Sequence, residues 1–165
     1  MADVNASTGP RSGGAGRVLG IDLGSVRIGI ALSDPSRTVA SPHSVVPRGR
    51  DHATDHRAIL EMVRAEEVTA IVVGMPLSMS GASGPAARAA AVEIEELRTV
   101  VGADIAVVAH DERLTTVTAE RSLGNARMKR ARRREVVDKV AAAVMLQSWL
   151  DRRADNAPSL DATPR

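Results

Sequence analysis

The sequence predicts an α/β fold in which helices flank a mixed central sheet. Short apolar runs bounded by glycine or proline recur along the chain and have the length of buried strands. The first runs follow one another directly, whereas the later ones alternate with segments whose apolar residues repeat every three or four positions. An initial hairpin followed by alternating helices and strands gives antiparallel and parallel pairing within one sheet.

The strands are expected where the apolar runs are shortest and best bounded. A brief, glycine-containing link between the first two runs favours a hairpin, and the fourth run is expected to end at Gly74. Strands are predicted over residues 17–22, 28–33, 69–73 and 104–109, with a further strand at either 38–40 or 44–46.

The helices are expected between and after the later strands. In the second helix, Ser83 is predicted as the N-cap and Pro85 suits the first turn, while Gly124 would close the short third helix. Helices are predicted over residues 51–66, 85–101, 115–123 and 133–150.

Composition indicates one globular domain and excludes several kinds of site. The chain has 165 residues, 44% of them hydrophobic, which is enough for a single core. It has no cysteine, so disulfides and thiolate metal sites are excluded, and a cytoplasmic location is expected. No apolar run approaches the length of about 20 residues that spans a membrane. With Trp149 as its only aromatic residue, the chain lacks the aromatic platforms on which single-strand binders stack bases.

The domain is expected to span residues 17–150. Residues 1–16 consist largely of small and polar residues, and residues 151–165 are polar and contain proline. Both segments are predicted to be disordered tails.

Charge is distributed very unevenly. Residues 113–134 contain eight Arg or Lys residues and one acid, a net charge of +7, so the rest of the chain carries −5 to give the total of +2. The densest part, residues 127–134, is either a solvated helix face or a surface that binds phosphates. We favour phosphate binding, because like charges at this density repel one another unless a polyanion is present.

Three acidic residues stand out by their placement. Asp22 lies inside an apolar run, Glu112 is placed at the C-terminal end of the last predicted strand, and Asp138 shares a small apolar helix surface with alanines. Each has a structural alternative: Asp22 could cap a turn or pair with Arg27, Glu112 could be an exposed loop acid, and Asp138 could pair with Arg134. A hard divalent cation, Mg²⁺ or Mn²⁺, would explain all three acids together.

Four motifs, in order, resemble those of the YqgF (RuvX-like) family, whose members are Holliday-junction-resolvase-like proteins linked to cleavage of ribosomal RNA precursors. Residues 22–29 (DLGSVRIG) resemble its D-x-G-x-x-R-x-G motif, and residues 74–77 (GMPL) with Gly81 resemble its G-x-P-x loop. Residues 111–116 (DERLTT) and 138–142 (DKVAA) match its D-E-R-L-T-T and D-x-x-A-A motifs. The resemblance covers about residues 17–150.

The resemblance implies an RNase H-like, RuvC-related fold with an active site of Asp22, Glu112 and Asp138 around Mg²⁺ or Mn²⁺. It implies a nuclease that trims the 5′ end of the pre-16S ribosomal RNA, with resolution of four-way DNA junctions as the alternative. A fourth acid that some proteins of this fold carry has no clear counterpart here, which leaves the number of metal ions open.

The nucleic-acid-binding residues are expected beside these acids. Arg113 could pair with Glu112 or Asp111, but we favour a contact with a substrate phosphate, and for Arg27 the two roles are weighed equally. The glycine-containing loop at residues 74–81 is either a phosphate-binding loop or an ordinary connection. The basic block adds four residues, Lys129, Arg130, Arg132 and Arg133.

Two other functional classes fit parts of the sequence. An actin-like ATPase lobe also opens with a D-x-G hairpin, but such enzymes need two lobes. A non-catalytic nucleic-acid-binding module would not need all three acids. The substrate is therefore expected to be a structured RNA precursor or branched DNA. A homodimer is expected for a junction resolvase but is not needed by an RNA-trimming enzyme.

Overall fold

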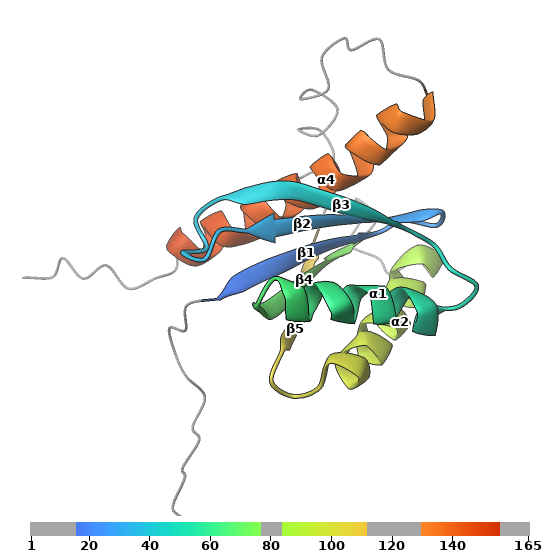
Figure 1. Ribbon diagram of the computed structural model, residues 1–165, viewed down its shortest axis with the longest axis horizontal. Coiled ribbons are helices and arrows are strands. Elements are labelled where there is room, and N and C mark those ends of the chain that lie inside the picture. The colour runs from blue at the N-terminus through green and yellow to red at the C-terminus, as the bar shows by residue number, and fades with distance from the viewer. Residues whose placement is uncertain (1–15, 77–83, 112–129, 156–165) are drawn as a thin grey trace, which may run out of the picture.

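A single five-stranded sheet organises the chain. The structure, a computed structural model, describes residues 16–76, 84–111 and 130–155 (Figure 1). The strands lie in the order β3-β2-β1-β4-β5. They are β1 (Arg17–Leu23), β2 (Arg27–Ser33), β3 (Ala40–Pro47), β4 (Val68–Met75) and β5 (Ala106–Asp111). The described helices are α1 (His52–Ala65), α2 (Pro85–Val101) and α4 (Arg130–Asp155).

The sheet is mixed, as predicted. Strands β1, β2 and β3 pair antiparallel, and the expected hairpin joins β1 to β2. Strand β1 also pairs in parallel with β4, and β4 in parallel with β5. The carboxyl ends of β1, β4 and β5 therefore meet at one edge of the sheet, the position at which α/β proteins place their sites.

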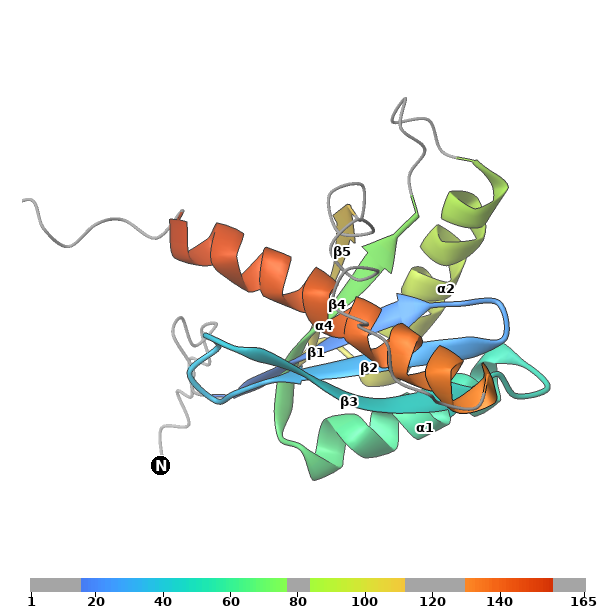
Figure 2. The ribbon, with the colours of Figure 1, turned by 90° about the horizontal axis from the view of Figure 1, so that it is seen from above.

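Helices cover both faces of the sheet. Helix α4 crosses one face, while α1 and α2 lie against the other (Figure 2). Each face has its own apolar core. The core under α4 contains small residues of the sheet and larger ones of the helix: Val18, Ala31, Ala70, Val72, Ala142, Ala143, Met145, Leu146, Trp149 and Leu150. The core under α1 and α2 is built mainly from Leu, Ile and Val.

Several predicted boundaries need correction. The last strand, predicted over 104–109, runs as β5 from Ala106 to Asp111. The third strand, β3, contains the candidate at 44–46, whereas of the candidate at 38–40 only Ala40 belongs to it; β3 pairs with β2 along its length with a register irregularity. Strand β4 continues through Gly74 to Met75, because these residues pair with the end of β5. The N-cap of α2 is Gly84, which caps without a side-chain hydrogen bond, so the prediction of Ser83 was wrong; Pro85 is in the first turn as expected.

Helix α4 is longer than the predicted span of 133–150 and ends at Asp155. Its last turns have side-chain support: Gln147 Nε2 donates to Asp151 Oδ1 at 2.8 Å, and the Arg153 guanidinium lies 4.9 Å from the centre of the Trp149 ring. Residues 151–155, predicted as the start of a disordered tail, are therefore helical. Residues 1–15 and 156–165 of the predicted tails, and the predicted helix at 115–123, lie outside the described residues. No helix in the described ranges has the length and apolar character needed to cross a bilayer.

Candidate metal and nucleic-acid site

Asp22 and Asp138 are brought together where α4 crosses the β1–β2 hairpin. In the sheet register, Asp22 of β1 lies opposite Gly29 of β2. Gly29 in turn lies directly under the α4 backbone, since a Cβ atom built on it would be 2.7 Å from the carbonyl carbon of Asp138 and would overlap its oxygen. The absence of a side chain at Gly29 thus allows the close approach that places the two acids side by side.

Asp22 is a partly buried carboxylate without a compensating partner. Burial, and to a smaller extent repulsion from the nearby Asp138 carboxylate, together raise its pKa from 3.8 to about 6. Among the described residues, none donates a hydrogen bond to this carboxylate. Burying an unpaired charge costs free energy, so the site favours either a proton or a cation at Asp22.

Arg27 pairs with Asp138 and not with Asp22. Its Nε donates to Asp138 Oδ2 at 2.7 Å, and both side chains are partly exposed. The alternatives of an Asp22–Arg27 pair and an Asp138–Arg134 pair are therefore not the arrangement found. The terminal nitrogens of Arg27 have no acceptor among the described residues. They remain available to a phosphate oxygen beside the two acids.

Three of the predicted site residues lie together in the structure: Asp22, Arg27 and Asp138. Glu112, Arg113 and Lys129 fall outside the described residues, as does the remainder of the predicted loop at 77–81. Strand β5 ends at Asp111, the residue before Glu112. His110 is buried, and its Nε2 lies 3.4 Å from Ser148 Oγ of α4, which gives it a packing role.

The described part of the basic block forms the start of α4. Arg132 and Arg133 are exposed there, and Arg130 is the first residue of the helix. Arg132 precedes Asp138 by six residues, which is about 9 Å along a helix axis. The helix that carries Asp138 thus also carries exposed cations next to it, as a site for a polyanion requires.

The donor chemistry suits Mg²⁺ or Mn²⁺. Two carboxylates face the same space, and one of them, Asp22, lacks a partner among the residues that the structure describes. Hard divalent cations prefer such oxygen ligands. Within the described ranges, no group of three or more His, Asp or Glu side chains is arranged so that it could hold a metal ion. A third ligand would therefore have to come from elsewhere in the chain, and Glu112 is the residue that the sequence predicted for this role.

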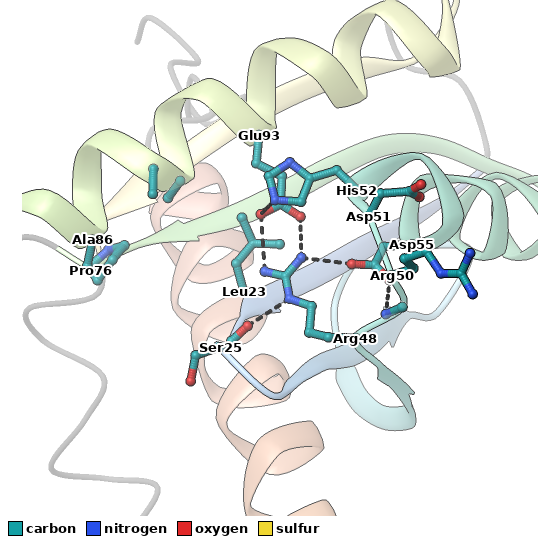
Figure 3. Close-up of a pocket in the computed structure, with 14 residues that line it drawn as sticks. Leu23, Ser25, Arg48, Arg50, Asp51, His52, Asp55, Pro76, Ala86 and Glu93 are labelled. Carbon is teal, nitrogen blue, oxygen red and sulfur yellow. Dashed lines mark hydrogen bonds and ion pairs between the residues drawn. The ribbon is translucent and has the colours of Figure 1, made fainter.

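A second charged cluster was not predicted from the sequence. Arg48 follows β3, and its guanidinium contacts Asp55 of α1 and Glu93 of α2, both of which are buried (Figure 3). These residues line a pocket of about 480 Å³ that also includes Gly24 and Ser25 of the β1–β2 turn. Arg48 and Glu93 are 45 positions apart, so no local spacing signals their contact.

The pKa of Asp22 gives a direct test of this geometry. We expect the Asp22 carboxyl to titrate at about 6 in the metal-free protein, and Asp138→Asn to lower this midpoint by removing the neighbouring negative charge. Carbon-detected NMR titration of the aspartate carboxyls measures both values. Asp151→Asn, a change on the exposed end of the same helix, serves as the control and should leave the midpoint unchanged. A wild-type midpoint near 4 would contradict the burial and pairing described above.

Comparisons with known proteins agree with this fold. The model of the RuvX family, described as Holliday junction resolvase, matches residues 16–152. A protein of Roseiflexus is 45% identical over 136 residues, covering 82% of this chain and 94% of the relative, and one of Gluconobacter oxydans is 46% identical over 145 residues, covering 87% and 89%. Both carry the name "Putative pre-16S rRNA nuclease".

Solved structures show the same fold at low sequence identity. RuvC of Thermus thermophilus in complex with a Holliday junction substrate superposes with a TM-score of 0.50 at 17% identity, covering 84% of this chain and 95% of RuvC. The yeast mitochondrial Holliday junction resolvase gives the same TM-score at 13% identity, covering 85% and 80%. The predicted RNase H-like, RuvC-related fold is thereby confirmed.

Proposed function

The chain belongs to the RuvX family of Holliday-junction-resolvase-like proteins, and from that premise we propose that it is a divalent-metal-dependent nuclease that hydrolyses phosphodiester bonds. One observation carries the proposal. The partly buried Asp22 carboxylate has no partner among the described residues and lies beside Asp138 at the carboxyl edge of the sheet. A cation explains this costly arrangement, and the basic start of α4 explains which kind of substrate it serves.

In the proposed site, Asp22, Glu112 and Asp138 hold Mg²⁺ or Mn²⁺. When bound, such an ion supplies a Lewis acid that neutralises phosphate charge and activates water. Arg27 orients Asp138 through its Nε, while its free terminal nitrogens contact the substrate phosphate. Arg113 is proposed to contact a second phosphate oxygen. Lys129, Arg130, Arg132 and Arg133 hold the backbone further along the chain of the nucleic acid.

The substrate that we propose is the 5′ region of pre-16S ribosomal RNA, by analogy with the names of the relatives at 45% and 46% identity. A four-way DNA junction is the second candidate, favoured by the description of the family model and by the fold shared with RuvC. Resolution of a junction would need a two-fold dimer. Processing of ribosomal RNA would place the protein in the cytoplasm, with residues 17–150 as the catalytic domain.

A single-turnover cleavage assay with Mn²⁺ distinguishes the two substrates. It compares a pre-16S RNA fragment with an RNA that begins at the mature 5′ end, and a four-way DNA junction with a linear duplex of the same sequence. We expect cleavage of the precursor and not of the mature-end RNA. Cleavage of the DNA junction alone would support junction resolution in place of RNA processing. Cleavage of neither substrate would overturn the proposed function.

The basic start of α4 makes a separate prediction about binding. Replacing Arg132 and Arg133 with Ala should reduce the slope of log K against log salt by about 2, since each phosphate contact contributes roughly one. Fluorescence anisotropy of a labelled nucleic acid measures this slope across a salt series, with Ca²⁺ in place of Mn²⁺ so that the substrate is not cleaved. Arg57→Ala with Arg64→Ala removes two exposed arginines from α1, on the opposite face of the sheet. That pair should leave the slope unchanged. Equal slopes for both pairs would move the phosphate contacts away from α4.

A further inference from the structure

The β1–β2 turn carries the candidate site on both of its flanks. Asp22 lies just before the turn and Arg27 just after it. The turn itself is tight, with the Gly24 amide donating to the Asp22 carbonyl at 3.1 Å. Any movement of this turn therefore changes how Asp22 and Arg27 face Asp138 on α4.

Arg48 holds this turn by two hydrogen bonds. Its backbone amide donates to the Val26 carbonyl at 3.0 Å, and its side-chain Nε donates to the Gly24 carbonyl at 2.9 Å. Both acceptors are main-chain atoms, so Arg48 constrains the path of the turn and not the orientation of a single side chain.

The far end of the Arg48 side chain is fixed by two buried carboxylates. Nη1 and Nη2 donate to Oε1 and Oε2 of Glu93 at 2.5 and 3.1 Å, and Nη1 also donates to Asp55 Oδ2 at 3.0 Å (Figure 3). The second oxygen of Asp55 accepts from the Gly49 amide at 2.7 Å. Glu93 is 4% exposed and Asp55 2%, and Arg48 is the nearest cation to both, while His52 and His56 lie farther away, each 3.7 Å from Glu93.

The arrangement is costly for a purely structural contact. Two carboxylates and one guanidinium are withdrawn from water at a place where apolar side chains of similar size would pack without that desolvation cost. The charged network fixes the orientation of the Arg48 side chain, since a guanidinium bonded at Nε, Nη1 and Nη2 has no rotational freedom left. Three elements, α1, α2 and the end of β3, are thereby joined to the turn.

We propose that Arg48 is a positioning residue, which clamps the β1–β2 turn to α1 and α2 and thereby sets where Asp22 and Arg27 stand relative to Asp138. The proposal rests on the proposed nuclease function. Arg48 acts through the turn and needs no contact with the substrate.

Arg48→Lys tests the clamp, with Arg98→Lys as the matched control. Lysine keeps the positive charge for Glu93 and Asp55, but one ammonium lacks the fork that also reaches the Gly24 carbonyl. Arg98 of α2 likewise bonds a main-chain carbonyl, Val107 O, through Nε and Nη2 at 3.2 and 3.0 Å, but it does not touch the turn. The same substitution therefore removes a similar clamp elsewhere.

Two readouts are expected to separate the variants. Arg48→Lys should lower kcat by about 10- to 100-fold with KM changed by less than about threefold, because misplaced ligands slow the reaction while the basic start of α4 still holds the substrate. Hydrogen exchange at the amides of residues 24–27 should accelerate by about tenfold. Arg98→Lys should change neither quantity by more than about twofold. Glu93→Gln gives the same test in milder form, because the glutamine amide keeps one of the two side-chain oxygens that accept from Arg48 at this position.

The outcomes are distinct. If Arg48→Lys leaves exchange in the turn unchanged, or speeds exchange without lowering kcat, the positioning role is overturned. A wild-type protein that cleaves no nucleic acid would overturn the proposed function instead, and the exchange measurement would still report whether Arg48 holds the turn.

Discussion

Asp22→Asn is expected to stabilise the metal-free protein while it abolishes cleavage. The pKa of Asp22 is about 6 in the folded protein against 3.8 for a free carboxyl. The folded state therefore binds this proton more tightly than the unfolded state does, so the charged group destabilises the fold above pH 6. That cost shrinks as pH falls through 6 and is gone below about 4, where Asp22 is protonated in both states.

The expected size follows from the shift. A difference of about two pKa units corresponds to roughly 3 kcal/mol at neutral pH. Removing the charge would recover this free energy, but the buried asparagine amide, which has no hydrogen-bond partner, would offset about half of it. Asp22→Asn should thus stabilise by on the order of 1–2 kcal/mol, a rise in Tm of roughly 5 °C at pH 7.5, and less near pH 4. Cleavage should fall by at least about 10³-fold with binding retained, because the substitution removes a metal ligand and keeps its shape.

Asp34→Asn provides the opposite control. Hydrogen bonds from Ser36 and from the backbone amides of Val39 and Thr38 hold the pKa of Asp34 well below its usual range. The charged form of Asp34 therefore stabilises the fold at neutral pH, and this substitution should lower Tm and leave cleavage intact. A fall in Tm for Asp22→Asn, measured by calorimetry without metal, or cleavage at the wild-type rate, would contradict the role given to Asp22.

Gly29→Ala is expected to separate α4 from the sheet. The added methyl group would overlap the carbonyl oxygen of Asp138, which is main chain and has no side-chain freedom with which to move aside. Either the helix shifts or the β1–β2 hairpin does, at a cost of about 2–4 kcal/mol. Asp138 moves away from Asp22 in both cases, so the variant should lose most of its cleavage activity even where it is fully folded.

Gly84→Ala is the matched substitution. A Cβ atom at Gly84, the N-cap of α2, meets nothing within 4 Å. The change should cost at most about 1 kcal/mol through weaker capping and leave cleavage unaffected. Urea unfolding and single-turnover cleavage rates of the Gly29→Ala and Gly84→Ala variants test this difference. Equal effects of the two substitutions would show that α4 does not depend on Gly29 for its close approach.

The sequence predicted the buried strands best, because their signal is local. The runs that became β1 and β2 are apolar, short and separated by a glycine turn, and they formed the expected hairpin. Boundaries were wrong where distant partners decided them. Strand β4 passes through Gly74 because β5 pairs with it there, and α4 reaches Asp155 with the support of contacts made by Trp149 and Gln147.

The candidate site was predictable in two acids and in Arg27, but not in how these residues pair. Asp22 stood out because a carboxylate inside an apolar run needs a partner, and Asp138 because it shared a helix surface with alanines. The Arg27–Asp138 pair joins residues 111 positions apart, and the Arg48 network joins three elements, so neither leaves a pattern in the sequence. The sequence predicted Gly29 only as part of a strand. Its lack of a side chain is explained by α4, whose backbone crosses directly over it. The roles of Glu112, Arg113 and the basic block remain predictions.

Anomalous diffraction from crystals grown with Mn²⁺ tests the central claim most directly. We expect a manganese peak about 2.1 Å from a carboxylate oxygen of both Asp22 and Asp138, with Arg27 still beside it. The same crystals would show whether Glu112 is the third protein ligand. Manganese bound elsewhere, with Asp22 and Asp138 free of metal at saturating concentration, would contradict the account of these two acids as the centre of a nuclease site.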